Sequence, residues 1–289
     1  MMITKRLSFV LVLAACGPSG SSSNAGSASP STMAQTPVAA GATEPEEAEA
    51  APETPEETPE VAREAPPARP SMASWGELLQ TYVNDDGFRY AALHADDEAK
   101  AKLAAAALAV GSAQDLSSWS RDERLAFLIN AYNILTVHAV IERWPIEGVM
   151  EVEGFFDGIE HSVAGEQMTL NTLENERIRA VFGEPRIHFA VNCASTSCPP
   201  LRNAPFDAES LETSLEEQAR AFVRSSTSLR GRRVTVSKLF EWFADDFSAG
   251  GGVREFIAAR LDEEGAATVR NERTRLRYSD YDWSPNAAD

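Results

Sequence analysis

The sequence predicts an α+β fold: one helix-rich domain in which a small sheet accompanies a buried central helix. The first observation behind this class is the segment LAFLINAYNILTVHAVIERW, residues 125–144, which is apolar on nearly every side. A helix that is apolar all round is usually buried at the centre of a domain. The second observation is that helical patterns dominate, while the strand-like segments are short and irregularly spaced, which favours the α+β class.

The first residues of the chain have the pattern of a secretory signal. Lys5 and Arg6 precede the apolar run Leu7–Ala15, which is too short to span a bilayer as a mature helix. The run ends in LAAC, which resembles a bacterial lipobox and implies cleavage before Cys16 and lipidation of its sulfur. Gly17 stands where an Asp would favour the inner membrane, so we expect a lipid anchor in the outer membrane of a bacterial cell envelope. The alternative is an ordinary signal peptide with a chance cysteine.

A long acidic segment follows the signal. Residues 17–72 consist mostly of Ser, Gly, Ala, Pro and Glu, with nine Glu against two Arg. Such a segment cannot bury enough apolar surface to offset its chain entropy, and charge repulsion and proline keep it extended. The sequence therefore divides into a signal segment, 1–16, a disordered linker that acts as a tether, 17–72, and a globular domain, 73–289.

Charge limits the partners of this domain. The chain has a formal net charge of −18, and the domain remains acidic once the linker is set aside. An acidic surface argues against binding nucleic acid or anionic lipid headgroups through a broad basic face. We therefore expect no nucleic-acid partner and membrane contact through the lipid anchor only, while the oligomeric state stays open.

The helices of the first half have recognisable starts and ends. Residues 75–83 are amphipathic, and residues 96–110 are rich in alanine, so both are expected to be helical. Ser120 and Glu123 fit a capping box at the start of the central helix. Pro145 marks the end of that helix.

The central helix carries two amides on its apolar surface. Asn130 and Asn133 are three residues apart and lie on neighbouring positions of one face. A buried amide needs hydrogen-bond partners. One interpretation is that the two amides tie a neighbouring loop to the core; the other is that they line a site and orient a substrate or a catalytic side chain.

The second half alternates between short strands and helices. The pattern IEHSVAGEQMTL is typical of a hairpin turning at Ala164-Gly165-Glu166. The expected elements are, in order, this hairpin at 159–170, a helix at 170–182, a strand at 186–192, a helix at 207–223, a strand at 232–236, helices at 238–247 and 253–261, and an aromatic segment at 275–286 that packs back on the domain.

The stretch RIHFAVNCASTSCPPL, residues 186–201, holds two of the three cysteines of the chain. If it starts as a strand, alternation places His188 and Asn192 on one face and Cys193 with the apolar residues on the other. A proline pair follows Cys198 and forces a loop there, which leaves this cysteine free to turn back towards His188. This alternation predicts that Cys198 is the reactive thiol and that Cys193 is a small buried residue.

These residues also fit the roles of a thiol-dependent enzyme. Cys198 would be the nucleophile and His188 the base, with Glu174 or Asn192 orienting the imidazole. Backbone amides of residues 194–198 would form an oxyanion hole. An alternative is that His188 is a core histidine bonded to a carbonyl group.

Two structural roles compete with this chemistry. A disulfide between Cys193 and Cys198 is chemically allowed in an oxidising envelope and would exclude the thiol mechanism. A metal site would have only three ligands, the two cysteines and His188, with His161 as a distant fourth, and the C-x4-C spacing is looser than usual for zinc. We expect no metal and no cofactor.

Several segments together resemble one family. The residues NAYNILTVHAVIERWP, the helix with Glu174, RIHFAVNCASTSCPPL, KLFEWFADDF and YDWSPN follow in the same order as in the bacterial and plant family called domain of unknown function 547. The resemblance spans residues 75–286, and the stretch from Arg186 to Leu201 is its most specific part.

The resemblance implies a relationship to cysteine hydrolases, although the family has no settled activity. The recurrent residues of its pattern correspond here to Glu174, His188, Cys193 and Cys198, with Asn130 and Asn133 in the helix motif. Three positions depart from the pattern, namely Leu128 for a common Trp, Asn175 for a common His and Pro285 for a Leu. The change at Asn175 removes an alternative base and leaves His188 as the main candidate.

The sequence thus leads to two hypotheses. The first is an envelope-tethered enzyme of cysteine-dependent acyl transfer or amide hydrolysis that acts on a small-molecule or peptide substrate, with Cys198, His188 and Glu174 in the roles given above. The second is a non-catalytic envelope module that binds a partner or acts as a scaffold, in which the same cluster is structural. A reactive thiol in a cleft would favour the first.

Overall fold

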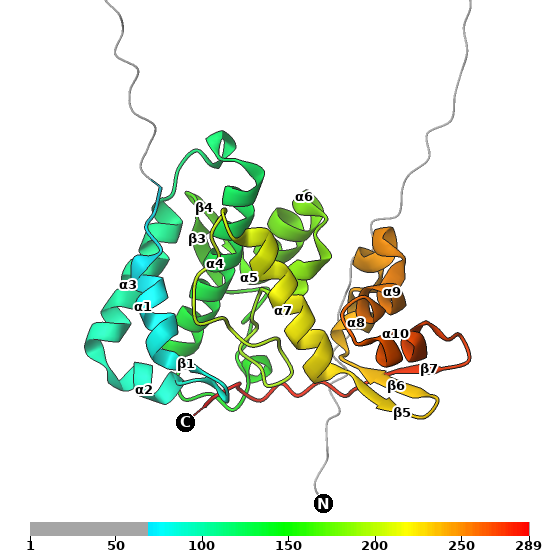
Figure 1. The fold of residues 1–289 in the computed structure, drawn as a ribbon. Helices are drawn as coiled ribbons and strands as arrows, with labels where there is room; N and C mark the ends of the chain where they lie inside the picture. Colours follow the sequence, from blue (N-terminus) through cyan, green and yellow to red (C-terminus); the bar gives the residue numbers. More distant parts are fainter. Residues whose placement is uncertain (1–68, 289) are drawn as a thin grey trace, which may run out of the picture. The chain divides into compact units, whose positions relative to one another are not determined.

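A long buried helix, α4 (Arg121–Ile141), organises residues 69–288, the part of the chain that the computed structural model describes (Figure 1). Ser120 and Glu123 form the predicted capping box, in which each side chain binds the backbone N–H of the other residue. Nearly all of α4 from Leu125 onward is buried, so the predicted central helix is confirmed. The signal segment, Cys16 and most of the linker lie outside the described residues.

Short strands and many helices surround α4, which confirms the α+β class. The elements used below are α1 (Ala73–Tyr82), β1 (Val83–Asn84), β2 (Gly87–Phe88), α2 (Tyr90–Ala95), α3 (Asp97–Ser112), β3 (Glu160–Val163), β4 (Glu166–Thr169), α5 (Leu170–Thr172), η3 (Leu173–Arg179), α6 (Ala180–Phe182), η4 (Pro185–Phe189), α7 (Leu211–Ser226), β5 (Ser228–Arg230), β6 (Arg233–Val236), α8 (Leu239–Trp242), η5 (Ala244–Gly250), α9 (Gly252–Ala258), α10 (Glu263–Arg270) and β7 (Arg275–Tyr278).

The strands form three small sheets. β1 pairs with β2, and β3 pairs with β4, in each case antiparallel. The β3–β4 turn uses Ala164 and Gly165 with φ of 50° and 81°, the left-handed conformations that a tight two-residue hairpin requires, so the predicted hairpin is confirmed. The third sheet has the order β5-β6-β7, with β6 and β7 parallel.

Two clusters of buried apolar side chains support these elements. The larger one surrounds α4 and includes side chains of α1, α3 and η4, among them Ile187. The smaller one is rich in phenylalanine and joins α7, β6, α8 and α9 to Phe189. Neighbouring residues of η4 therefore face different clusters, and the cysteine stretch begins where the two clusters meet.

The prediction of a strand over residues 186–192 is wrong, because this segment starts as the 3₁₀-helical turn η4. Pro185 lies in the first turn, where a fixed φ is compatible with helical geometry. Glu184 caps this turn by accepting a hydrogen bond from the backbone N–H of Arg186 at 3.0 Å. Since Ile187, His188 and Phe189 are all buried, the apolar alternation did not mark one face of a strand.

Two predicted helices differ in detail from the structure. The helix expected at 170–182 is continuous through α5, η3 and α6, but its middle part, Leu173–Arg179, is a π-helix. The helix expected at 207–223 begins only at Leu211. Asp207 explains the later start, because its carboxylate accepts hydrogen bonds from the backbone N–H and the hydroxyl of Ser210 and holds a turn there.

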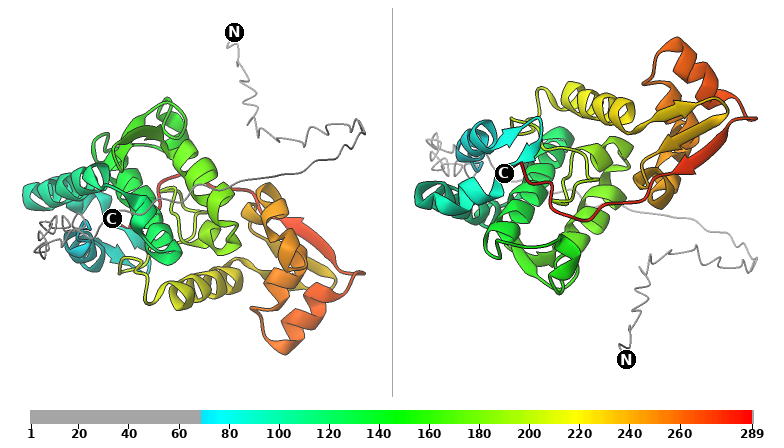
Figure 2. Two further views of the ribbon diagram at one scale, coloured as in Figure 1. Left: turned by 90° about the horizontal axis from the view of Figure 1, so that it is seen from above. Right: turned by 90° about the horizontal axis from the view of Figure 1, so that it is seen from below.

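The C-terminal segment returns across the domain after β7, as the aromatic composition predicted (Figure 2). Its last residues reach the β1–β2 hairpin, where Phe88 N–H donates to Asn286 at 2.9 Å and Ala288 N–H donates to Phe88 at 3.1 Å. The approach is close at Gly87, because a Cβ there would collide with the backbone oxygen of Asn286. We call residues 279–288 the C-terminal strap.

Within residues 69–288, α4 is the helix whose length and composition would suit a membrane span. Its buried fraction of 89% over the apolar window matches the core helix of a folded domain.

Candidate thiol site

Two asparagines of α4 hold the polypeptide that carries the site. Asn133 Nδ2 donates to Ala190 O at 2.9 Å, and its Oδ1 accepts from Asn192 N–H at 2.8 Å. Asn130 makes the same pair of bonds with the backbone of Phe206, at 2.7 and 2.9 Å. Both side chains are buried, so the interpretation that these amides tie a loop to the core is confirmed.

Asn192 shapes the cysteine loop, residues 193–198, from within. Its Oδ1 accepts from Ala194 N–H at 2.8 Å, and its Nδ2 donates to Pro199 O at 2.7 Å. Ala194 has a φ of 61°, a conformation that non-glycine residues rarely adopt and that turns the loop back on itself. The two ends of the loop are thereby brought together. Asn192 supports the loop and does not orient His188.

The C-terminal strap fixes the middle of the loop. Thr196 N–H donates to Ser284 O at 2.8 Å, and Ser197 N–H donates to Asp282 O at 3.2 Å. In the other direction, Asn286 N–H donates to Ala194 O at 3.1 Å. These bonds place the strap residue Tyr281 against the first cysteine.

The two cysteines are free thiols in direct contact. Cys193 N–H donates to Cys198 Sγ at 2.9 Å. Cys193 Sγ lies 2.9 Å from the hydroxyl of Ser195 and 3.3 Å from the hydroxyl of Tyr281, and it bonds to both. The backbone of Ser195 contributes a further hydrogen bond to the same sulfur.

These contacts separate the pKa values of the two thiols. Burial alone would raise the pKa of Cys193, but hydrogen bonds from Cys198, Ser195 and Tyr281 lower it to about 7. Burial raises the pKa of Cys198, and the neighbouring Cys193 raises it further. Because the sulfurs interact so closely, the pair titrates as a unit that loses one proton easily and the second only with difficulty. The pKa order is opposite to the sequence-based expectation, in which Cys198 had the lower pKa.

Tyr281 is a proton donor in this arrangement. Burial, and then the charge of the two sulfurs, raises the pKa of its hydroxyl far above the ordinary value. The hydroxyl therefore stays protonated at neutral pH. A protonated phenol beside Cys193 favours the thiolate over the thiol there.

His188 does not contact the thiols. Its Nε2 bonds Asp246 Oδ2 at 2.7 Å, and its ring stacks on Phe243 with the ring centres 3.9 Å apart. The other ring nitrogen, Nδ1, is buried and has no hydrogen-bond partner among the described residues. The expected His188–Cys198 pair is absent from the structure between residues 69 and 288.

Asp246 is shared between His188 and a cation. Arg179 donates to its two carboxylate oxygens, with Nε to Oδ2 at 2.8 Å and Nη2 to Oδ1 at 3.0 Å. Burial would raise the pKa of Asp246, but the hydrogen bonds from His188 and Arg179 hold it well below the usual range. We call these three residues the ionic cluster.

Glu174 also differs from its expected role. Its carboxylate hydrogen-bonds the buried Tyr132 of α4. Burial, and then the charges of Glu174 and the two thiols, raise the pKa of Tyr132. Glu174 therefore lies near the thiol site through Tyr132, and within the described part of the chain it makes no hydrogen bond with His188.

The predicted oxyanion hole of loop amides is also wrong, because these amides already have acceptors. Ala194, Thr196, Ser197 and Cys198 donate their N–H groups to oxygens of the loop or the strap. The N–H of Cys193 and the backbone of Ser195 serve the sulfurs instead. The loop thus stabilises negative charge on sulfur, not on a substrate oxygen.

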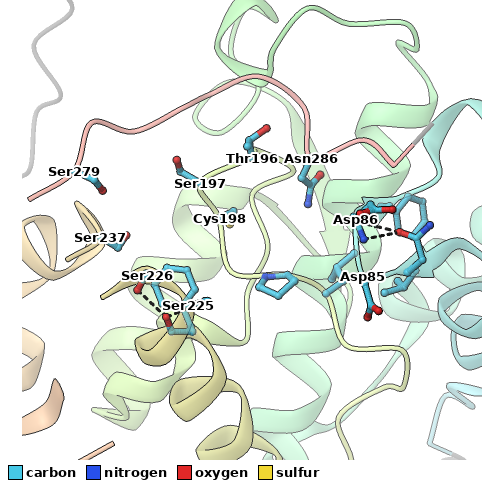
Figure 3. Close-up of a pocket in the computed structure, with 17 residues that line it drawn as sticks. Asp85, Asp86, Thr196, Ser197, Cys198, Ser225, Ser226, Ser237, Ser279 and Asn286 are labelled. Atoms are coloured by element: carbon cyan, nitrogen blue, oxygen red, sulfur yellow. Dashed lines mark hydrogen bonds between the residues drawn. The ribbon is translucent and has the colours of Figure 1, made fainter. Parts of the chain in front are cut away.

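A cleft of about 470 Å³ opens at Cys198. Figure 3 shows this cysteine below the C-terminal strap, with Asp85 and Asp86 on one side and Ser225 and Ser226 on the other. Among the described residues that line the cleft, those two aspartates are the only ones with charged side chains. Cys193 is not part of the lining, so a substrate in the cleft meets Cys198 first.

Three partners in the site were missed by the sequence interpretation, namely Tyr281, Ser195 and Asp246. Ser195 lies inside the cysteine loop, and a hydroxyl two residues from a cysteine was an available signal. Tyr281 and Asp246 lie 88 and 58 residues from their partners, and neither residue was given a role in the site, although their segments belong to the family resemblance. Between residues 69 and 288, His, Cys, Asp and Glu side chains form no group of three that would hold a metal ion.

The match to known families centres on this region. Residues 116–223 match the family described as "Protein of unknown function, DUF547". The matched part contains α4, the π-helical segment, η4 and the cysteine loop, which confirms the resemblance for these residues. The strap with Tyr281, and Asp246, lie outside it. No curated protein and no solved structure matches the chain.

Proposed function

We propose that this domain is an envelope-tethered, cysteine-dependent acyl transferase or hydrolase in which Cys198 is the nucleophile and Cys193 handles the proton. The observation that supports it is the contact between Cys193 N–H and Cys198 Sγ, which holds the two cysteines together as a pair that opens on a cleft. A preformed thiolate needs no imidazole to remove its proton. His188 therefore has no proton to transfer in this proposal.

Access to the cleft, and not the pKa values, decides which of the two sulfurs attacks the substrate. Cys193 has the lower pKa, whereas Cys198 lines the cleft. Because the two thiols titrate as a pair, the charge reaches Cys198 when the proton moves to Cys193. In that state the Cys193 N–H at 2.9 Å stabilises the Cys198 thiolate.

The reaction then proceeds in two steps. The Cys198 thiolate attacks an acyl carbon, Cys193 gives its proton to the leaving amine or thiol, and a thioester forms on Cys198. Cys193 is then the thiolate, held by Tyr281 and Ser195. In the second step it takes a proton from the water or amine that displaces Cys198, which restores the pair.

Asn286 is the side chain best placed to stabilise the oxyanion of this reaction. It lines the cleft with Cys198, and its Nδ2 is engaged only in a long hydrogen bond of 3.4 Å to Asn192 Oδ1. Side-chain amides serve as oxyanion donors in other acyl-transfer sites. Thr196 and Ser197 add hydroxyl groups to the same wall of the cleft.

Acyl-enzyme trapping tests the proposal. The protein is mixed with p-nitrophenyl acetate, and its intact mass and peptide map are recorded. We expect one acyl group on Cys198, none in Cys198→Ser, and in Cys193→Ala an acyl-enzyme whose hydrolysis is slower by about a hundredfold or more. Acylation of Cys193 alone, or of neither thiol, would overturn the assignment.

The envelope part of the proposal is tested at Cys16. The motivation is the LAAC sequence after a short apolar run. Expressed in a bacterium with a fatty-acid analogue, the wild type should be labelled and found with membranes. Cys16→Ala should remain an unlabelled precursor, and equal labelling of the two proteins would refute the anchor.

A further inference from the structure

Two thiols in contact are more than acyl transfer at one nucleophile requires. Cys193 and Cys198 are five residues apart, the N–H of Cys193 donates to Cys198 Sγ at 2.9 Å, and the loop between them is closed by Asn192 and by Ala194 in its left-handed conformation. A second sulfur within reach of the first is what thiol–disulfide exchange needs, because it can displace a bound sulfur and release the product.

We propose that the Cys193–Cys198 pair catalyses thiol–disulfide exchange with small neutral or positively charged disulfides that enter the cleft at Cys198. The inference rests on the reactive pair of the proposed function but not on acyl transfer. The charge preference comes from Asp85 and Asp86, since no cationic side chain from residues 69–288 lines the cleft.

The exchange balances without a metal or an added oxidant. The Cys198 thiolate attacks one sulfur of the substrate disulfide, an S–S bond forms, and the other half leaves as a thiolate that takes the proton from Cys193. The Cys193 thiolate then attacks Cys198 Sγ, and the second half of the substrate leaves and takes a proton from solvent. The protein is oxidised by two electrons to the Cys193–Cys198 disulfide, and the substrate is reduced to two thiols. A dithiol restores the pair by the reverse exchange.

The surroundings of each sulfur match its step. Cys198 lines the cleft, so it can meet a substrate. Cys193 lies away from the cleft, where Tyr281 and Ser195 stabilise it as a thiolate once its proton has left. Exchange at sulfur produces no oxyanion and therefore needs no free backbone amides. The loop amides that already donate to oxygens of the loop or the strap are thus compatible with this reaction. The amide of Cys193 and the backbone of Ser195 assist it by bonding the sulfurs.

Trapping of the mixed disulfide is the first test. The folded protein is incubated with bis(2-hydroxyethyl) disulfide and its intact mass is measured. We expect the wild type to lose two hydrogens without accumulating an adduct, and Cys193→Ser to accumulate one adduct on Cys198. The proposal fails if the wild type carries one adduct on each of Cys193 and Cys198, or if Cys193 is modified in Cys198→Ser while Cys198 is not modified in Cys193→Ser.

Turnover on the wild type is the second test, and it does not depend on variants that fold. The second thiol lies beside the first, so it can displace the bound half of the substrate faster than a free thiol in solution can, and the rate per site should exceed that of free cysteine. With dithiothreitol as reductant, catalytic amounts of protein should reduce the disulfide at this enhanced rate, and a rate per site no higher than that of free cysteine would refute catalysis.

The two proposals fail in different ways. If p-nitrophenyl acetate acylates Cys198 but the disulfide is not turned over, only the exchange proposal fails. If the disulfide is turned over without acylation, only acyl transfer fails. The charge preference is tested with cystamine, whose ends are cationic, against dithiodipropionate, whose ends are anionic. Asp86→Asn should reduce the advantage of cystamine, whereas the distant Asp157→Asn should not, and equal rates for both disulfides in the wild type would refute the preference.

Discussion

The thiol pair and the ionic cluster are two polar groups of one domain that differ in how their charge is balanced. Adjacent residues contact both, because the ring of Trp242 packs on Tyr281 with centres 4.8 Å apart and Phe243 stacks on His188. In the ionic cluster, Asp246 is fully matched by two hydrogen bonds from Arg179 and one from His188. In the thiol pair, the donors that the described part of the chain supplies are neutral amide and hydroxyl groups.

This difference separates a structural role from a reactive one. A carboxylate held by a guanidinium and an imidazole gains little from further partners. A thiolate held by hydroxyl and amide groups keeps its nucleophilicity, and one sulfur of the pair lines a cleft. The type of residue alone suggested that His188 and the cysteines act together. Their partners indicate that His188 belongs with Asp246 and the cysteines with Tyr281.

The largest expected effect is on the rate of alkylation, when one residue of each region is substituted in turn. Cys198→Ser should abolish alkylation by iodoacetamide at the cleft, a loss of at least a hundredfold in rate. His188→Gln should leave the rate at Cys198 within about twofold, because no hydrogen bond joins the imidazole to either thiol. The rates are measured by mass spectrometry from pH 5 to pH 10.

Thermal unfolding of both variants provides the control, since only a folded His188→Gln protein is informative. If that protein is folded and its alkylation profile moves to higher pH, the imidazole does support the thiolate, and the separation between the two regions would be lost.

The next largest effect is the loss of folding stability when the ionic cluster is disrupted. Asp246→Asn removes the charge that pairs with Arg179 and His188, whose side chains are 21% and 1% exposed. The free energy of unfolding should fall by about 2 kcal/mol, less than for a fully buried pair because Asp246 is itself 26% exposed. The exposed pair between Arg270 and Glu255 gives a matched control, and Glu255→Gln should leave stability nearly unchanged because solvent screens that pair.

The pH dependence of that difference has a defined sign. The pKa of Asp246 is lowered in the folded state, so its ionised form contributes stability above the unfolded pKa of about 3.9. This contribution is lost as the pH falls through the lower folded pKa. Denaturant unfolding should therefore show a wild-type advantage over Asp246→Asn at pH 7 that shrinks below about pH 4. An advantage that grows towards acid would contradict this account of the cluster.

Local patterns made much of the fold predictable. The capping box at Ser120, the apolar run of α4 and the Ala164-Gly165 turn each depend on residues a few positions apart, and the structure has all three. For the two asparagines of α4, the structure has the bonds of one of the two interpretations, because an amide on a buried helix has few alternatives to bonding a neighbouring backbone. These features involve one element or the end of one.

The site was less predictable because its partners come from distant segments. The prediction of a strand at 186–192 was wrong because η4 is buried on more than one side. Its apolar residues therefore alternate in the sequence although the segment pairs with no sheet within residues 69–288. His188 pairs with Asp246 because of how the smaller, phenylalanine-rich cluster packs. Cys193 pairs with Tyr281 because the C-terminal strap returns across the domain. No spacing in the sequence encodes which N–H groups of the cysteine loop are already occupied.

The smallest expected effect tests whether neutral donors tune the thiol pair. Tyr281→Phe removes one hydroxyl, 3.3 Å from Cys193 Sγ, and keeps the ring that packs on Trp242 and Trp283. The pKa of the pair should rise by about half a unit, because one of several hydrogen bonds to the thiolate is lost. Alkylation at pH 7 should then slow by about twofold to threefold, while the rate at pH 10, where the thiolate forms in both proteins, should be equal. Tyr278→Phe in β7 is the matched control, since no hydrogen bond links its hydroxyl to a sulfur in the described part of the chain, and it should leave the profile unchanged. If Tyr281→Phe instead lowers the rate equally at every pH, the hydroxyl positions the loop without stabilising its charge, and the contrast between the two regions would then rest on access to the cleft alone.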